Sequence, residues 1–203
     1  NAAHSDITST SVALGSIVHD NSVVAAQVDG FTIGGTVTYK FYAAGDCTGT
    51  FTSETLAVGT ESSATSALAA GSYSYKASYS GDANYKSSEG TCEPFAVSKA
   101  QLDVSTLIHN AAHSDITSTA VALGSIVHDT ATVTGAVSGF TTPDVAFTFY
   151  SNIACSETGS SVSNTGAEGS AVRSADSSAL ATGSYAYKAS IAGNDNYLGD
   201  NSD

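Results

Sequence analysis

The chain has 203 residues, and its 19 acidic side chains outnumber the six basic ones, giving a net charge of −13. This charge excludes nucleic acid as a ligand, because phosphate binding requires clustered Lys and Arg. Hydrophobic residues reach 41%, enough for packed cores, and no apolar run approaches the roughly 20 residues that span a bilayer. We therefore expect folded domains whose surface is mostly Ser, Thr, Gly and Ala.

The most informative feature is an internal repeat. The stretch NAAHSDITST begins at residue 1 and again at residue 110, and VALGSIVHD begins at 12 and again at 121. Further on, LAAGSYSYKASYSGDANY at 68–85 corresponds to LATGSYAYKASIAGNDNY at 180–197. The sequence therefore predicts two homologous domains, at 1–100 and 101–203.

The two copies are unmatched at their ends. Copy one includes CEPFAVSKA at 92–100, for which copy two has no counterpart, and copy two opens with QLDVSTLIH at 101–109, for which copy one has none. We expect the last strand of copy two to be missing, or to be supplied by a neighbouring repeat or chain. Either the chain is a window on a longer array, or neighbouring chains complete one another by strand donation.

Apolar residues alternate with period two almost throughout, in short runs separated by Gly, Asn, Asp and Ser, which is typical of an all-β protein. Tyr79 in copy one becomes Ile191 in copy two, a change that a buried face accepts. Val24, Ala26 and Val28 are likewise predicted to point inward. Seven strands are expected per copy, at 102–108 continuing through 115–122, 22–28, 36–44, 50–58, 62–69, 72–80 and 91–99.

About seven short strands in about 100 residues predict two tandem immunoglobulin-like β-sandwich domains. The stretch LAAGSYSY supports this fold, because it has the spacing of a tyrosine corner, in which a Tyr near the start of the sixth strand bonds to nearby backbone. The corner residues are Tyr73 in copy one and Tyr185 in copy two.

LAAGSYSYKASYSGDANY resembles the signature of bacterial and archaeal Ig-like repeat domains (group 3 type) from large cell-surface proteins. In that family an L-x-x-G-x-Y entry and a Y-x-G-D-x-N-Y exit bracket the sixth strand. GSIVHDNSVVAAQVDGF, TVTYKFY and CEPFAVSKA are similar to one sub-group, while copy two departs at GNDNY. The resemblance covers essentially the whole chain and implies secretion, tandem repetition and roles in adhesion, stalks or extracellular filaments, without catalytic residues.

The three cysteines are Cys47, its repeat equivalent Cys155, and Cys92, which has no partner in copy two. In a secreted array we expect a disulfide within each domain, Cys47–Cys92, which leaves Cys155 unpaired within this stretch. The alternative is three buried thiols.

Four histidines recur between the copies, as the pairs His4/His113 and His19/His128. His109 and His113 are four residues apart, but their stretch is expected to be strand and loop rather than helix, so the spacing does not indicate a zinc site. Recurrence in both copies favours a structural role at the domain junction over metal binding.

The turns GDANY and GNDNY offer oxygen atoms that Ca²⁺ could use. The candidate ligands are Asp82, Asn84, Asp195 and Asn196. The alternative is a turn closed by Asx side chains with the following tyrosine packed beneath it, and we favour this alternative. No other cofactor is expected.

No nucleophile lies at a recognisable spacing from a base, so an enzyme is not expected. Lys40, Lys76 and Lys188 fall on outward faces, which argues against intramolecular isopeptide bonds.

The leading hypothesis is a structural segment of an extracellular filament, stalk or surface adhesin on a prokaryotic cell, contacting identical repeats or subunits head-to-tail. One alternative is an adhesin module that recognises a glycan or a host protein through exposed Tyr42 and Tyr150. Another is a non-catalytic spacer in a large secreted enzyme.

Overall fold

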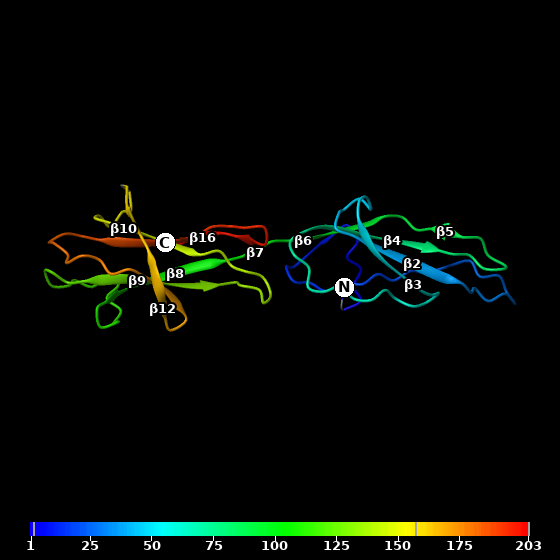
Figure 1. Cartoon of the computed structure of the whole chain (residues 1–203), viewed down its shortest axis with the longest axis horizontal. Helices are drawn as coiled ribbons and strands as arrows, with labels where there is room; N and C mark the ends of the chain where they lie inside the picture. Colours follow the sequence, from blue (N-terminus) through cyan, green and yellow to red (C-terminus); the bar gives the residue numbers. More distant parts are fainter. Residues whose placement is uncertain (2, 157, 203) are drawn as a thin grey trace. The chain divides into compact units, whose positions relative to one another are not determined.

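The computed structural model describes residues 1, 3–156 and 158–202, and it separates into two compact units, Asn1–Lys99 and Ala100–Asp203. We call them unit 1 and unit 2. Both are built from β-strands (Figure 1), as the period-two pattern predicts. Within the described ranges there is no helix, and hence none long and apolar enough to cross a membrane.

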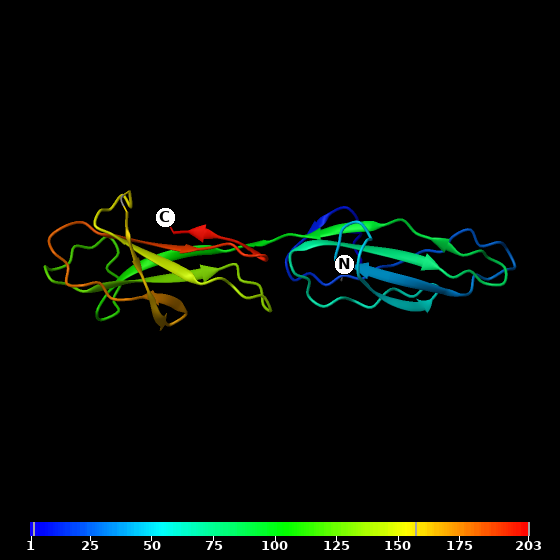
Figure 2. The ribbon, with the colours of Figure 1, turned by 45° about the horizontal axis from the view of Figure 1, so that its top comes forward.

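Unit 1 contains one six-stranded sheet in the order β1-β6-β4-β2-β3, with β5 paired to β4 (Figure 2). Its strands are β1 (Ser11–Val12), β2 (Thr36–Tyr42), β3 (Phe51–Ala57), β4 (Gly71–Tyr79), β5 (Ser88–Glu89) and β6 (Glu93–Val97). The predicted inward positions Val37, Tyr39, Tyr75 and Tyr79 of β2 and β4 are buried, but Ser74, which the alternation of β4 places on the opposite face, is buried as well.

The core of unit 1 joins this sheet to segments without strand structure. Val18 and Leu68, which lie in such segments, pack against Tyr75, Phe95 and Val97 of β4 and β6. Burial of side chains of this size contributes about 1.5–3 kcal/mol each relative to exposure. The second layer of unit 1 is therefore held by side-chain packing more than by a strand ladder.

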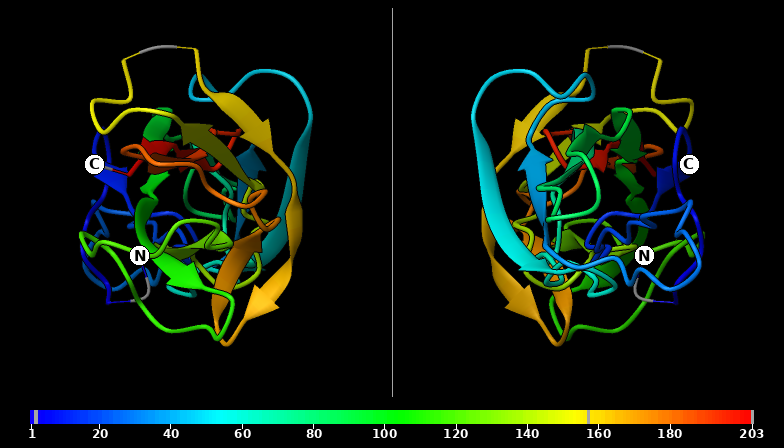
Figure 3. Two further views of the ribbon diagram at one scale, coloured as in Figure 1. Left: turned by 90° about the vertical axis from the view of Figure 1, so that its left-hand side faces the viewer. Right: turned by 90° about the vertical axis from the view of Figure 1, so that its right-hand side faces the viewer.

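Unit 2 has two four-stranded sheets, ordered β11-β10-β14-β16 and β12-β13-β9-β8, and a small sheet of β7 and β15. Its later strands carry the yellow-to-red end of the colour scale in Figure 3. Its strands are β7 (Ala100–Gln101), β8 (Asp103–Asn110), β9 (Val127–Thr134), β10 (Val145–Tyr150), β11 (Ser160–Val162), β12 (Asn164–Glu168), β13 (Ala171–Ser174), β14 (Ala186–Ile191), β15 (Tyr197–Leu198) and β16 (Asp200–Asn201). Val127 of β9 and Tyr187 of β14 meet in one apolar cluster, which gives a sandwich-like arrangement.

The strands predicted at 22–28 and 62–69 do not form in unit 1. In unit 2, β9 extends into the part that corresponds to 22–28, whereas β13 ends at Ser174, the counterpart of Ser62. The physical reason is pairing, since β9 is bonded along its whole length to β8. Unit 1 has no described segment equivalent to β8, so the strand that would order 22–28 is absent.

Two further strand predictions are wrong. Residues 115–122 form only an isolated bridge, between His109 and Asp115, because the chain turns there with Ser118 at a φ of 59°. Val28, predicted to point inward, is 58% exposed, and Ala26 has a φ of 67°, which breaks the alternation of an extended strand.

Tyr42 was expected on the outer face, but it is only 6% exposed. Phe51 stands opposite Tyr42 in the β2–β3 ladder, and the two ring centroids are 5.3 Å apart, so Phe51 covers the tyrosine. Tyr150, its counterpart, is half-buried.

The tyrosines of the two predicted corners make the same local bond. The Tyr73 hydroxyl donates to the Ala69 carbonyl at 3.0 Å, and the Tyr185 hydroxyl donates to the Ala181 carbonyl at 3.1 Å. Each bond fixes the chain where it enters the strand that carries the central core tyrosine.

The predicted disulfide is present between Cys47 and Cys92, and Cys155 is a free thiol. The bond ties the loop after β2 to the residue before β6. A disulfide of this kind indicates a non-reducing environment.

Replacing both Cys47 and Cys92 by Ser should lower the free energy of unfolding of unit 1 by about 4 kcal/mol, because the bond closes a loop of 45 residues. Calorimetry should show that only the transition of unit 1 moves. Cys155→Ser is the matched control and should move neither transition. An unchanged unit 1 in the double variant would contradict the prediction.

Candidate functional site

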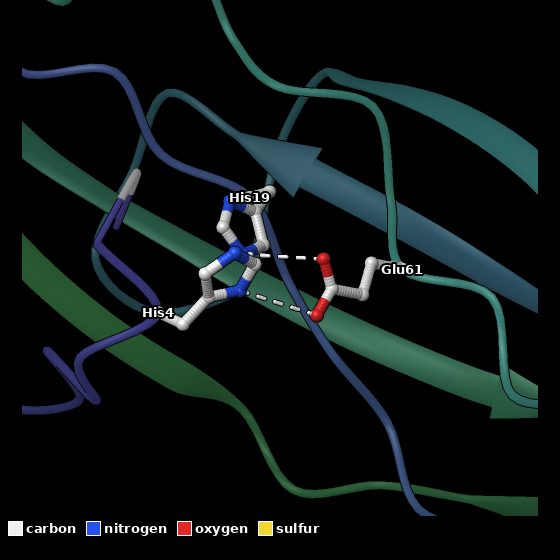
Figure 4. A group of neighbouring side chains, drawn as sticks. All are labelled: His4, His19 and Glu61. Carbon is white, nitrogen blue, oxygen red and sulfur yellow. Dashed lines mark ion pairs between the residues drawn. The ribbon is translucent and has the colours of Figure 1, made fainter.

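In each unit, repeat-equivalent histidines converge on one carboxylate. In unit 1, His4 Nδ1 lies 3.4 Å from one carboxylate oxygen of Glu61, and His19 Nε2 lies 3.6 Å from the other. Figure 4 shows both rings turned toward the carboxylate. The two rings also contact each other edge-on, with centroids 4.9 Å apart.

Backbone bonds between two irregular segments bring His19 and Glu61 together. The Ser62 amide donates to the Asp20 carbonyl at 2.9 Å, and the Asp20 amide donates to the Ser62 hydroxyl at 2.8 Å. These reciprocal bonds fix the residues directly before them. His4 comes from a turn and has a φ of 55°, a conformation that non-glycine residues seldom adopt.

In unit 2, three histidines surround Glu168. His109 Nδ1 is 2.7 Å from one oxygen, and His113 Nδ1 and His128 Nε2 are 2.6 and 2.9 Å from the other. His113 corresponds to His4 and has nearly the same φ, 60°. The equivalent histidines use the same ring nitrogens in both units.

The carboxylate comes from a different sequence position in each unit. Ser174 corresponds to Ser62, because its hydroxyl accepts the Asp129 amide at 2.9 Å in the same way. The residue before it, Arg173, therefore takes the place of Glu61. Arg173 Nε lies 3.7 Å from a Glu168 oxygen, and Arg173 also bonds to Asp176.

The electrostatics of Glu168 follow from these contacts. Burial alone raises the pKa of Glu168, but hydrogen bonds from His113, His128 and His109 outweigh burial and lower this pKa to about 2. Glu168 thus stays ionised over the whole range in which proteins normally fold.

Sequence reasoning identified His4, His19, His113 and His128 but missed both glutamates. The repeat carried no signal for them, because Glu61 and Glu168 occupy non-equivalent positions. The histidines of each unit meet a carboxylate of that same unit, while their proposed role at a domain junction stays a prediction.

A second feature is a groove of about 420 Å³ in unit 2, lined by residues 118–123 and 180–185 together with other apolar side chains. Leu123, which lines it, is 77% exposed. The corresponding place in unit 1 is occupied by β6, which pairs with β4 on one side and β1 on the other. The groove is therefore the position of a strand that unit 2 does not contain among its described residues.

The neighbours of this open strand position are less ordered than their counterparts. β4 begins at Gly71, but β14 begins only at Ala186, whereas the counterpart of Gly71 is Gly183. No strand forms at 120–121, which corresponds to β1. Both changes follow from the lack of a bonding partner in the groove.

The two units also differ in the hydrogen-bond partner of one buried carboxyl group. In unit 1, Asp20 and Glu93 of β6 share a hydrogen bond, and burial together with the Asp20 carboxyl raises the pKa of Glu93 to about 7. In unit 2, Asp129 is fully buried, and burial raises its pKa to about 7, with a partial offset from the Thr130 amide. Neither Asp129 oxygen has a hydrogen-bond partner of good geometry among the described residues.

The turns considered for Ca²⁺ have their first side chain committed to backbone bonds. One Asp82 oxygen accepts the amides of Asn84 and Tyr85, and the other accepts the Gly34 amide. Asn194 closes the equivalent turn of unit 2 by accepting the amides of Asn196 and Tyr197. These bonds are those of an Asx turn. Asn84 and Asn196 take part in these bonds through their backbone amides, and Asp195 is not among them.

No family model matches the chain, no curated protein matches it, and no solved structure matches it.

Glu168→Gln should destabilise unit 2 at neutral pH and progressively less in acid. A lowered carboxyl pKa contributes stability above the unfolded value of 4.5, and this contribution is lost as the pH falls to about 2. Denaturant unfolding of both proteins at several pH values between 6 and 2 should show the two curves converging. A difference that is independent of pH would contradict the assignment.

Proposed function

We propose that the chain is a structural segment of tandem Ig-like repeats from an extracellular filament, stalk or surface adhesin of a prokaryote. Support comes from the internal repeat, the disulfide and the sequence resemblance. The observation that carries the proposal is the internal repeat, which places two homologous β-units one after the other in a single chain. The groove of unit 2 lies where unit 1 holds β6, so a strand of that kind would complete the unit.

The occupant we propose is an extended strand equivalent to β6, supplied by a neighbouring repeat or subunit. Unit 1 gives the template, because its own β6 places Phe95 and Val97 into the apolar cluster that contains Leu68 and Tyr75. The counterparts of these two acceptor residues, Leu180 and Tyr187, line the groove of unit 2. Unit 2 therefore offers the same two apolar contacts, through Leu180 and Tyr187, to an added strand of the β6 type.

Polar complementarity favours the same occupant. A β6-like strand begins with a glutamate, and in unit 1 this glutamate bonds to Asp20. Asp129 is the equivalent of Asp20 and is buried without such a partner. An unmade hydrogen bond to a buried group costs about 1–3 kcal/mol, and the incoming glutamate would remove that cost by sharing a proton with Asp129.

The backbone would contribute as well. The β6 strand pairs with Gly71–Tyr75 antiparallel and with Ser11–Val12 parallel. An added strand in unit 2 would bond to 183–187 and 120–121 in the same register, which is β-strand addition. Specificity would come from the alternate side chains that point into the groove.

A synthetic peptide of residues 92–99, with Cys92→Ser to prevent oxidation, should bind saturably to the intact chain. Hydrogen exchange read by NMR should show new protection of the amides at 183–187 and 120–121. A matched peptide that carries both Phe95→Ser and Val97→Ser should bind at least tenfold more weakly, because each substitution removes the burial of one large apolar side chain.

Variants of the chain provide a second test that uses the same peptide, so differences in solubility between peptides do not affect the comparison. Leu123→Asp lies in the groove and should weaken peptide binding, while Val23→Asp, on the exposed surface of unit 1, should not. Absence of binding, or equal binding by both peptides, would overturn the proposed assembly mode.

The adhesin alternative is weakened by the burial of Tyr42, since the repeated pair of exposed aromatic residues that it required is not formed. We therefore do not propose a glycan-binding role. The spacer alternative needs a catalytic domain in flanking sequence, and no observation on this chain favours it over a filament or stalk.

A further inference from the structure

We propose that His4, His19 and Glu61 of unit 1 form a binding site for a divalent transition metal ion, with Zn²⁺ as the best-fitting ion. The ligand atoms of the three side chains all lie within 4.8 Å of one another. They line a cavity of about 320 Å³ in unit 1. This site is independent of the strand groove, which belongs to unit 2.

The spacing of the ligand atoms fits a metal better than direct hydrogen bonds. Hydrogen bonds between nitrogen and oxygen are about 2.7–3.2 Å long, but the two histidine–carboxylate distances here are 3.4 and 3.6 Å. In a tetrahedral zinc site, with bonds of about 2.0–2.1 Å, neighbouring ligand atoms are roughly 3.3–3.4 Å apart. The distances from each histidine nitrogen to its nearer Glu61 oxygen are therefore close to the separation that a central ion would impose, and all three ligand groups lie within 4.8 Å of one another.

The charge around the site also favours a cation. The carboxyls of Glu61, Asp6, Asp20 and Glu93 line the cavity, and neither Lys nor Arg is among its described lining residues. Asp20 and Glu93 share a proton through their hydrogen bond, Asp6 is near the N-terminal ammonium of Asn1, and Glu61 has the two histidines as its basic neighbours. A dication would neutralise this concentration of acidic groups.

Unit 2 provides an internal comparison. Its histidines contact Glu168 at 2.6–2.9 Å, so the cluster is closed by direct hydrogen bonds. The Arg173 guanidinium lies beside it, 3.7 Å from Glu168 and 3.4 Å from His128 Nδ1, and supplies the positive charge. Arg173 stands at the position that Glu61 holds in unit 1. Unit 2 therefore carries a fixed positive charge at this position, whereas unit 1 carries a carboxylate that can bind a metal ion.

The ligand chemistry selects the class of metal. Two imidazoles with one carboxylate suit Zn²⁺ and related ions, whereas Ca²⁺ and Mg²⁺ prefer oxygen ligands throughout. His4 is 67% exposed and Glu61 is 39% exposed, so a fourth position faces solvent and can take water. The bound ion would connect the first residues of the chain with segments near 19 and 61, none of which lies in a strand.

Isothermal titration of the intact chain with Zn²⁺ should show one equivalent bound, with Ca²⁺ and Mg²⁺ giving no competition at the same concentration. Glu61→Gln should weaken Zn²⁺ binding at least tenfold, and the matched variant Glu168→Gln should leave stoichiometry and affinity unchanged. Co²⁺ in place of Zn²⁺ should give the visible absorption bands of a four-coordinate site, and these should disappear in Glu61→Gln.

His4→Asn guards against misfolding, because His4 is exposed and Asn tolerates the same backbone conformation. It should retain the far-UV spectrum of the parent chain and lose Zn²⁺ affinity at least tenfold. At a hundredfold excess over the dissociation constant, Zn²⁺ should raise the Tm of unit 1 by roughly 10 °C. No Zn²⁺ binding, or binding abolished by Glu168→Gln but not by Glu61→Gln, would overturn the proposal.

Discussion

The structure depends on one constraint, which is that a β-strand forms where its backbone groups pair with a neighbouring strand on at least one edge. Among the described residues, each unit contains one strand with no counterpart in the other. In unit 2, β8 orders β9 along eight residue pairs. In unit 1, β6 extends β4 to Gly71 and creates β1. Nearly identical sequences therefore adopt different secondary structure in the two units, because their pairing partners differ.

The presence or absence of β6 also affects the buried carboxyl groups. A buried carboxyl is tolerated when another group shares its proton, as Glu93 does for Asp20. The equivalent Asp129 has no such neighbour among the described residues, and burial raises its pKa to about 7. An open backbone edge, an apolar groove and an unpaired acid thus coincide at one place. This coincidence supports strand completion more strongly than any one of the three features would.

The histidine clusters illustrate how a repeat diverges while its geometry persists. Both units bring equivalent histidines to a carboxylate through the same ring nitrogens. Unit 2 closes its cluster with short hydrogen bonds and a neighbouring guanidinium. Unit 1 retains wider spacing and has neither Lys nor Arg among the described residues that line its cluster, and both features support the proposal that it binds a cation. A metal ion in unit 1 would supply the positive charge that Arg173 supplies in unit 2. An added strand in unit 2 would supply the pairing that β6 supplies in unit 1.

The sequence by itself determined the repeat, the all-β class and the inward positions of the central strands, because these features are encoded by local periodicity and by comparison of the two copies. It favoured the Cys47–Cys92 bond over three free thiols only through the expected secretion of the chain, and the structure contains that bond. Only the tertiary structure decided that Tyr42 is covered by Phe51, that 22–28 stays irregular, and that Glu61 and Glu168 each meet the histidines of their own unit. The physical reason is that these outcomes rest on contacts between segments far apart in the chain. Because Glu61 and Glu168 occupy non-equivalent positions in the repeat, comparison of the two copies does not reveal that each glutamate contacts the histidines of its own unit.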